Sequence, residues 1–293
     1  RMGMRHVFRW LVVCTTLIAL GACAPFHKPL APEARARITE VDLRVVVAQE
    51  TFMFTAQGSN VSAALGGGLI GALIDSSVQR SRQKDMASQI QATVGPLLDV
   101  DYRIEATAAV DALQRTSAFP VKLSSAQVLA GMPGKREHEA RIAAAGKSPA
   151  YLLMWVHYEL APDLSVFSTR STVQLWQDGT SEPTYRAGVV YQTRLKGDTR
   201  DALMKRLTDN QGARLRALMR ESMQESLRMV ATDLAVPHAS GAARSGQLRS
   251  ASVWTQGLWV PIKDMKLVDE TPVRQFLRND EGALLSIGSE IGS

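Results

Sequence analysis

The two cysteines of this 293-residue chain are the residues whose chemistry is easiest to delimit. Cys14 lies inside an apolar segment near the N-terminus, and Cys23 follows the end of that segment. If the segment is removed, Cys23 remains as a lone thiol, which cannot form an intramolecular disulfide or a thiolate metal cluster. The chemistry left to Cys23 is therefore covalent modification or exposure as a free thiol.

The residues before Cys23 have the order of an export signal. Residues 1–9 include three arginines and no acidic residue, and residues 11–20 are mainly apolar. The apolar segment is shorter than the roughly 20 residues that a permanent membrane span requires. An ordinary secretory signal with an incidental cysteine is the alternative interpretation, and it leaves the position of the cysteine unexplained.

The sequence LGAC at 20–23 resembles the lipobox of bacterial lipoproteins, a leucine followed by two small residues and a cysteine. The resemblance covers the signal region alone. It implies that residues 1–22 are a signal peptide and that Cys23 becomes an N-terminus carrying acyl chains such as palmitate. Several chains, at about 0.8 kcal/mol per buried methylene, make a stable membrane anchor. Because Ala24 stands where an aspartate would favour the inner membrane, the resemblance implies the outer membrane of a Gram-negative-type bacterium, with the domain facing the periplasm.

A glycine cluster over 66–71 formally matches the G-x-G-x-x-G pattern of dinucleotide sites. That pattern needs a strand directly before it, whereas these glycines lie inside the apolar, small-residue stretch 61–74, which is too short to span a membrane. Two ladders of small residues at four-residue spacing fit better: Ala63, Gly67 and Gly71, and beside them Ala64, Gly68, Ala72 and Ser76. Such ladders let helices approach closely. We expect packing within the fold, self-association into a homo-oligomer, or membrane contact.

Metal and hydrolytic chemistry find little support in the sequence. The histidines after Cys23 are far apart and form no H-E-x-x-H pair; they are His27, His138, His157 and His238. We interpret His138, between two glutamates, as part of a solvated helix face, and His157 as an ordinary histidine of a strand. No nucleophile-elbow or S-x-x-K motif occurs in a suitable context. We therefore expect no metal, no cofactor and no enzymatic activity, although a triad assembled only in space stays open.

The charge of the chain argues against nucleic acid as a partner. The formal net charge of +6 includes the three arginines of the expected leader, and the rest of the chain has no run of lysine and arginine. Nucleic-acid binders concentrate such residues on a face or in a run. The partners we expect are the membrane, through Cys23, and an envelope protein or a second copy of the chain.

The pattern of apolar residues predicts an α+β fold, with a mainly antiparallel sheet packed by long helices and a small C-terminal β-rich unit. After a proline-rich tether over 23–40, we expect an α/β domain over 41–235. Its first half is predicted to contain strands over 41–55, 101–107 and 119–123, the glycine-rich helix 59–94, and short helices over 124–129 and 137–145.

The most regular pattern lies in the second half of this domain. Three β-rich runs separated by turn residues predict an antiparallel meander over 150–196. A helix is predicted over 201–234, and its apolar stripe is expected to pack on the meander; the stripe consists of Leu215, Leu218, Met219, Met223, Leu227, Val230 and Leu234. A linker over 236–252 is expected to lead to the β-rich unit 253–293, whose strands could extend the main sheet.

Five aromatic residues of the predicted meander allow two interpretations. Trp155, Tyr158, Trp176, Tyr185 and Tyr191 could form a stacking face for glycans, but core packing explains them with fewer assumptions. Our first hypothesis is a non-enzymatic outer-membrane lipoprotein in envelope assembly, secretion or scaffolding, an architecture that loosely resembles lipoproteins of surface-fibre and secretion channels. The alternatives are a glycan- or lipid-binding periplasmic module and, more remotely, an envelope hydrolase.

Overall fold

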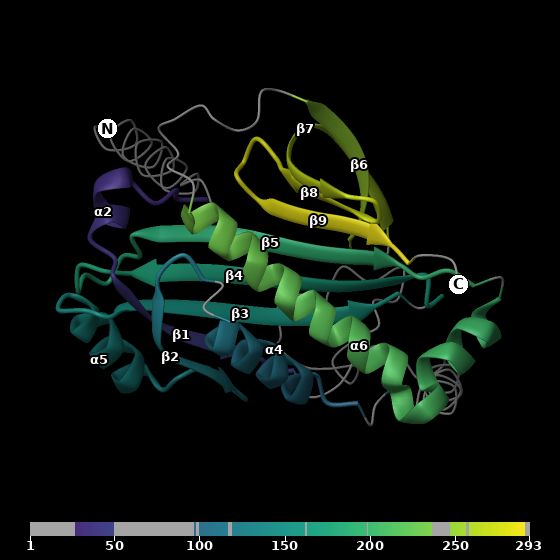
Figure 1. Cartoon of the computed structure of the whole chain (residues 1–293), viewed down its shortest axis with the longest axis horizontal. Coiled ribbons are helices and arrows are strands. Elements are labelled where there is room, and N and C mark those ends of the chain that lie inside the picture. Colours follow the sequence, from purple (N-terminus) through teal and green to yellow (C-terminus); the bar gives the residue numbers. More distant parts are fainter. Residues whose placement is uncertain are drawn as a thin grey trace, which may run out of the picture.

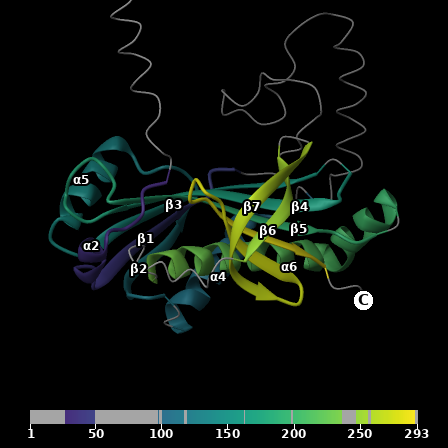
Figure 2. The ribbon, with the colours of Figure 1, turned by 90° about the horizontal axis from the view of Figure 1, so that it is seen from above.

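The computed structural model describes residues 27–49, 97, 100–116, 119–161, 163–197, 199–235, 247–255 and 258–290. These residues form one nine-stranded sheet whose strands follow the order β2-β1-β3-β4-β5-β9-β8-β7-β6. Helices α4 and α6 cover one face of the sheet, and α5 lies on the other face at one end (Figures 1 and 2).

The described helices are α2 (Pro32–Ala36), α4 (Tyr102–Thr116), α5 (Lys135–Ala145) and α6 (Arg200–Ala235). The strands are β1 (Glu40–Val46), β2 (Lys122–Leu129), β3 (Ala150–Leu160), β4 (Val166–Trp176), β5 (Tyr185–Arg194), β6 (Leu248–Thr255), β7 (Leu258–Thr271), β8 (Arg274–Arg278) and β9 (Leu284–Ser289). The fold is therefore α+β, as the sequence predicts.

The sheet is mixed, so the expectation of a mainly antiparallel sheet holds only in part. The β3-β4-β5 meander and the β9-β8-β7-β6 ribbon are antiparallel. Strand β1 is parallel to both β2 and β3, and β9 is parallel to β5. Parallel pairs need long crossover connections, and such pairing between distant segments leaves no local signal in the sequence. The β5–β9 pairing confirms that the C-terminal strands extend the main sheet.

Two predictions in the first half of the domain are wrong. Residues 102–107 of the strand predicted over 101–107 belong to helix α4 instead, and the buried positions of this helix follow the helical period: Tyr102, Glu105, Ala106, Ala109 and Val110. Residues 124–129 belong to strand β2 rather than to a helix. The serines there do not cap a helix: Ser124 Oγ donates to the Val41 carbonyl, because pairing with β1 overrides the local signal.

Helix α6 confirms the predicted apolar stripe, since all seven of its residues are buried. The helix is nevertheless not continuous. Asp209 is extended, and Asn210, Gln211 and Gly212 all have left-handed backbone angles, which separates a short first part from a long second part (Figure 1). Helix α5 matches the helix predicted over 137–145.

Side chains of β3 show how the sheet separates its two faces. Leu152, Met154 and Val156 belong to the main core beneath α4 and α6. Tyr151 and Leu153 point the other way into a smaller cluster under α5. This alternation follows from the two-residue period of a strand.

The described part of the expected tether is packed rather than extended. Lys28 exchanges backbone hydrogen bonds with Arg186 of β5, both at 2.9 Å. Leu30 and Ala34 are buried in the main core. C-terminal to α6, the linker expected over 236–252 is too long, since strand β6 begins at Leu248.

Candidate functional site

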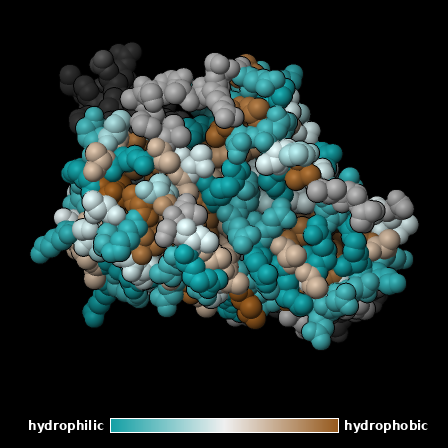
Figure 3. Space-filling view, in the orientation of Figure 1, coloured by the Kyte–Doolittle hydropathy of each residue, from teal (hydrophilic) through white to brown (hydrophobic). Residues whose placement is uncertain are grey.

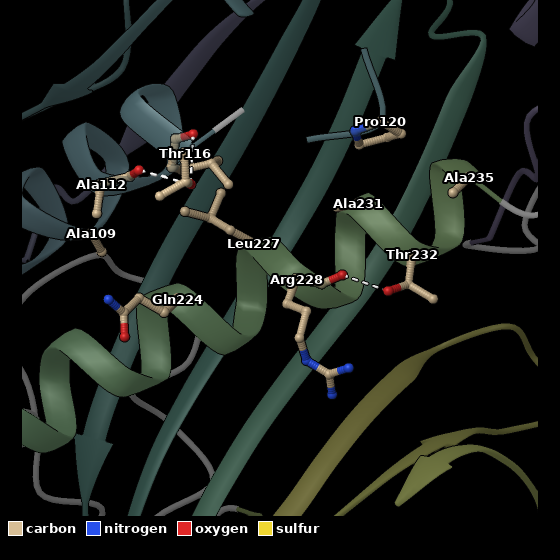
Figure 4. A pocket seen from close by; sticks show the side chains of 11 residues that line it. Ala109, Ala112, Thr116, Pro120, Gln224, Leu227, Arg228, Ala231, Thr232 and Ala235 are labelled. Atoms are coloured by element: carbon tan, nitrogen blue, oxygen red, sulfur yellow. Dashed lines mark hydrogen bonds between the residues drawn. The ribbon is translucent and has the colours of Figure 1, made fainter. Parts of the chain in front are cut away.

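A groove lies between α4 and α6 on the helical face of the sheet. It has a volume of about 480 Å³, within the range of about 300–1,000 Å³ typical of ligand pockets. Ala109, Ala112, Leu113 and Thr116 of α4 form one wall, and Leu227, Ala231 and Ala235 of α6 form the other. Pro120, which follows α4, also lines it (Figure 4).

Both walls repeat with the period of a helix. Leu227, Ala231 and Ala235 are spaced by four residues, so they form one row along α6. A second row of α6, formed by Gln224, Arg228 and Thr232, borders the groove on its polar side. Four of the lining residues are alanines, whose short side chains leave room beside the two helices.

The polar atoms around the groove are mostly engaged elsewhere. Thr116 Oγ1 donates to the Ala112 carbonyl at 3.0 Å, and Thr232 Oγ1 donates to the Arg228 carbonyl at 2.8 Å (Figure 4). Each threonine thus satisfies its hydroxyl within its own helix. The space between the walls is therefore apolar in character.

Arg228 is held away from α4 by two carboxylates. Its Nε and Nη2 bind both oxygens of Glu225, at 2.7 and 2.9 Å, and its Nη1 binds Asp269 at 2.9 Å. The hydrogen bond with Glu225 raises the pKa of Arg228, so the guanidinium group keeps its positive charge. This paired arrangement makes Arg228 a border of the groove rather than a reactive group inside it.

Buried polar contacts fix α4 against α6 and thereby set the width of the groove. Glu105 of α4 is almost fully buried and accepts hydrogen bonds from Arg220 of α6 at 2.6 and 2.9 Å. One turn earlier, the Tyr102 hydroxyl lies 2.8 Å from Ser222 Oγ. On the surface, small apolar patches are scattered among hydrophilic side chains over this face (Figure 3).

The residues singled out in the sequence do not belong to this groove. Cys23 and the small-residue ladder of Ala63, Gly67, Gly68, Gly71 and Ala72 lie outside the described residues. Lipidation of Cys23 and close packing by the ladder stay predictions. The sequence alone does not predict the groove, because the helix that carries one wall begins in a segment interpreted as a strand, and the other wall lies more than 100 residues later.

The described histidines lie in separate places. His138 of α5 is not simply solvated: its ring is half-buried, 5.1 Å from the Trp176 ring, and Nδ1 is 3.3 Å from the Tyr151 hydroxyl. His157 lies on the exposed side of β3, and its ring centroid is 5.2 Å from that of Trp155. Within the described ranges, no group of three or more histidine, cysteine, aspartate or glutamate side chains is placed to hold a metal ion.

The aromatic residues of the meander pack mainly in the interior. Tyr158, Trp176, Tyr185 and Tyr191 are buried, which confirms core packing for these four and removes them from any glycan-stacking face. Tyr158 stacks on Tyr102 at a centroid distance of 4.5 Å. Trp155 differs, with 39% of its surface exposed.

The fold and the groove define an α+β domain with an apolar surface site between two helices. No protein-family model matches the chain, and no curated protein is similar to it. None of the helices in the described segments is both long and apolar enough to cross a membrane.

Proposed function

We propose that the protein is a non-enzymatic outer-membrane lipoprotein, anchored by acyl chains on Cys23, that acts in envelope assembly, secretion or scaffolding. Its folded domain would hold an amphipathic helix of an envelope partner in the groove between α4 and α6. The observation that carries this proposal is the groove, whose apolar walls repeat at helical spacing. The expected lipobox supports the location of the protein at the outer membrane, and the groove is the site where the partner would bind.

A helix is the occupant that suits these walls. Rows of side chains spaced by four residues on one helix fit between the corresponding rows of another. An incoming helix would place large apolar side chains against Ala112 and Ala231, because alanines leave room for close approach. Gln224 at the polar border would contact the polar side of that helix. The lining contains no carboxylate, imidazole or thiol, which favours binding over catalysis.

Photo-crosslinking in envelopes tests the groove. A photoreactive residue in place of Gln224 should crosslink to a specific protein, and Ala112→Phe, which fills the groove, should abolish that product. Ala144→Phe on the exposed side of α5 is the matched control and should leave it intact. The proposal fails if Gln224 gives no product, or if both phenylalanine variants behave alike.

Two further readouts separate the proposal from its alternatives. Cys23→Ser should remove radiolabelled palmitate from the protein and release it from the outer-membrane fraction. Lipid that co-purifies with the unaltered protein but not with Ala112→Phe would favour the lipid-binding alternative, since an acyl chain also suits an apolar groove. Retention on peptidoglycan would favour the glycan-binding alternative.

A further inference from the structure

The link between the expected lipid anchor and the folded domain is short. Only residues 24–26 separate Cys23 from His27, where the described structure begins. An extended chain covers at most about 3.6 Å per residue, so the Cα atoms of Cys23 and His27 are no more than about 14 Å apart. A compact domain of this size has a radius of gyration of about 18 Å. The link is therefore shorter than the domain is wide.

The chain makes several contacts with the sheet at His27 and Lys28, where the link joins the folded domain. The His27 ring packs edge-on against Tyr185, with centroids 6.4 Å apart, and it also lies against the backbone of Gly282. Lys28 is bridged to Arg186 through the backbone, and its Nζ is 3.1 Å from Glu182. A pull on Cys23 would thus be transmitted to the sheet itself.

We call this part of the molecule the anchor end; it comprises His27, Lys28, the β4–β5 turn over 177–184 and the β8–β9 turn over 279–282. The C-terminal part of α6 lies at the same end, because the Tyr185 hydroxyl donates to Asp233 at 2.8 Å. The break in α6 lies at the opposite end (Figure 1). The 23 residues from 213 to 235 separate the two ends by about 34 Å at 1.5 Å per residue.

We infer that the anchor end is the surface with which the domain meets the lipid headgroups, while the break in α6 points away from the membrane. This inference rests on the proposed acylation of Cys23. A link shorter than the radius of the domain cannot pass around it, so the surface that surrounds His27 faces the bilayer. The anchor end carries both signs of charge, including the Lys28–Glu182 and Arg37–Asp178 pairs. We therefore attribute the orientation of the domain on the membrane to the short link rather than to attraction between the domain and anionic lipid headgroups.

The orientation also places the groove. Ala235 lines the groove at the anchor end, and Pro120 lines both the groove and a small adjoining hollow that Leu30 helps to form. A helix bound there would lie close to the membrane surface. The partner of the groove is thereby narrowed to a protein with a helix adjacent to the same membrane.

Depth measurements on the acylated full-length protein test the orientation. The chain has no cysteine besides Cys14 and Cys23, so one introduced cysteine supplies the single free thiol. Fluorophores at Glu281→Cys on the anchor end and at Lys205→Cys on the far end occupy two exposed positions. In phosphatidylcholine vesicles that contain a headgroup-attached quencher, the Glu281 label should be quenched several-fold more than the Lys205 label. Equal quenching, or stronger quenching at Lys205, would overturn the inference.

A longer link provides the internal control. Inserting about 40 Gly/Ser residues between Ala24 and His27 adds an r.m.s. span of about 35 Å, which should bring the two labels to similar quenching. Quenching that stays unequal in this variant would show that something other than the short link sets the orientation. Mass spectrometry of the N-terminus reports acylation separately: an unacylated Cys23 overturns the proposed function, whereas an acylated protein with equal quenching overturns the orientation alone.

Discussion

The Tyr102 hydroxyl donates its hydrogen bond to Ser222 Oγ across the interface between α4 and α6. The two oxygens are 2.8 Å apart, and Ser222 Oγ is itself the donor to the Met219 carbonyl at 2.8 Å. Since the serine has one proton, Tyr102 and Thr169 must supply the protons of their own contacts with it. A chain of directed hydrogen bonds therefore joins α4, α6 and β4 inside the core.

Tyr102→Phe should destabilise the protein by about 1 kcal/mol, because it removes one buried hydrogen bond and retains the ring. Chemical denaturation would measure the loss. Tyr151→Phe is the matched control: its hydroxyl is 3.3 Å from His138 Nδ1 at a partly buried position, so the effect should be smaller. A larger loss at Tyr151 would contradict this account.

The protein should lose stability in alkali as its tyrosines ionise. Burial raises the pKa of Tyr102 from 10.0 to about 12, and burial also raises the pKa of the other four tyrosines of the chain. The unfolded chain releases these protons at lower pH than the folded one. The stability that they contribute is complete below pH 10 and is lost as pH rises through 12.

Absorbance at 295 nm and circular dichroism, followed together, would check this expectation. Tyrosinate should form in the same steep transition that removes secondary structure, and Tyr102→Phe should make the loss of stability above pH 10 less steep. Gradual ionisation near pH 10 in a folded protein would show that the phenols are accessible.

Glu290→Gln should cost about 1–3 kcal/mol of stability, because the carboxylate is buried and binds charged donors. Its oxygens accept hydrogen bonds from Arg206 and Arg214, which lie on either side of the break in α6, and from the backbone of Lys196. Glu182→Gln at the exposed Lys28 pair should cost less than about 1 kcal/mol. Thermal unfolding of both variants gives the comparison, and equal effects would argue against a bracing role for Glu290.

Gly212→Ala should destabilise the break by at least about 1 kcal/mol, because two effects act together. The backbone φ of +74° is unfavourable for a residue with a Cβ, and that Cβ would lie 2.9 Å from Val100 Cγ2. Gly131→Ala is the control, since a Cβ there has nothing within 4 Å. A Gly212→Ala protein as stable as the Gly131→Ala protein would show that the left-handed turn is not required.

The second half of the fold is predictable because its signals are local. Alternation marks the β3-β4-β5 meander, and the stripe from Leu215 to Leu234 marks the buried side of α6. The two failures have different causes. Strand β2 forms because it pairs with the distant strand β1. Residues 102–107 form the first turns of a helix whose period shows only when the pattern is followed to Val110. The break in α6 has a signal that the apolar stripe conceals, namely the left-handed preference of Asn210 and Gly212.

The candidate groove is harder to predict than the fold. Its walls join Ala109 and Ala112 to Ala231 and Ala235, and small residues at these positions are equally consistent with tight helix packing. The groove exists because α4 and α6 are held at a distance from each other. The Glu105–Arg220 and Tyr102–Ser222 contacts set this distance. Side-chain contacts between remote segments decide this spacing.

The parallel pairing of β9 with β5 has a consequence for aggregation. Val189 and Tyr191 of β5 are buried, and β9 pairs along the strand from Val189 to Arg194. A protein cut after residue 235 would present this row of backbone donors and acceptors, with apolar neighbours, as an open edge that recruits strands from other molecules. The C-terminal ribbon thus covers the β5 edge against pairing with strands of other molecules, and proteolysis that removes the ribbon would make the remaining domain prone to aggregate.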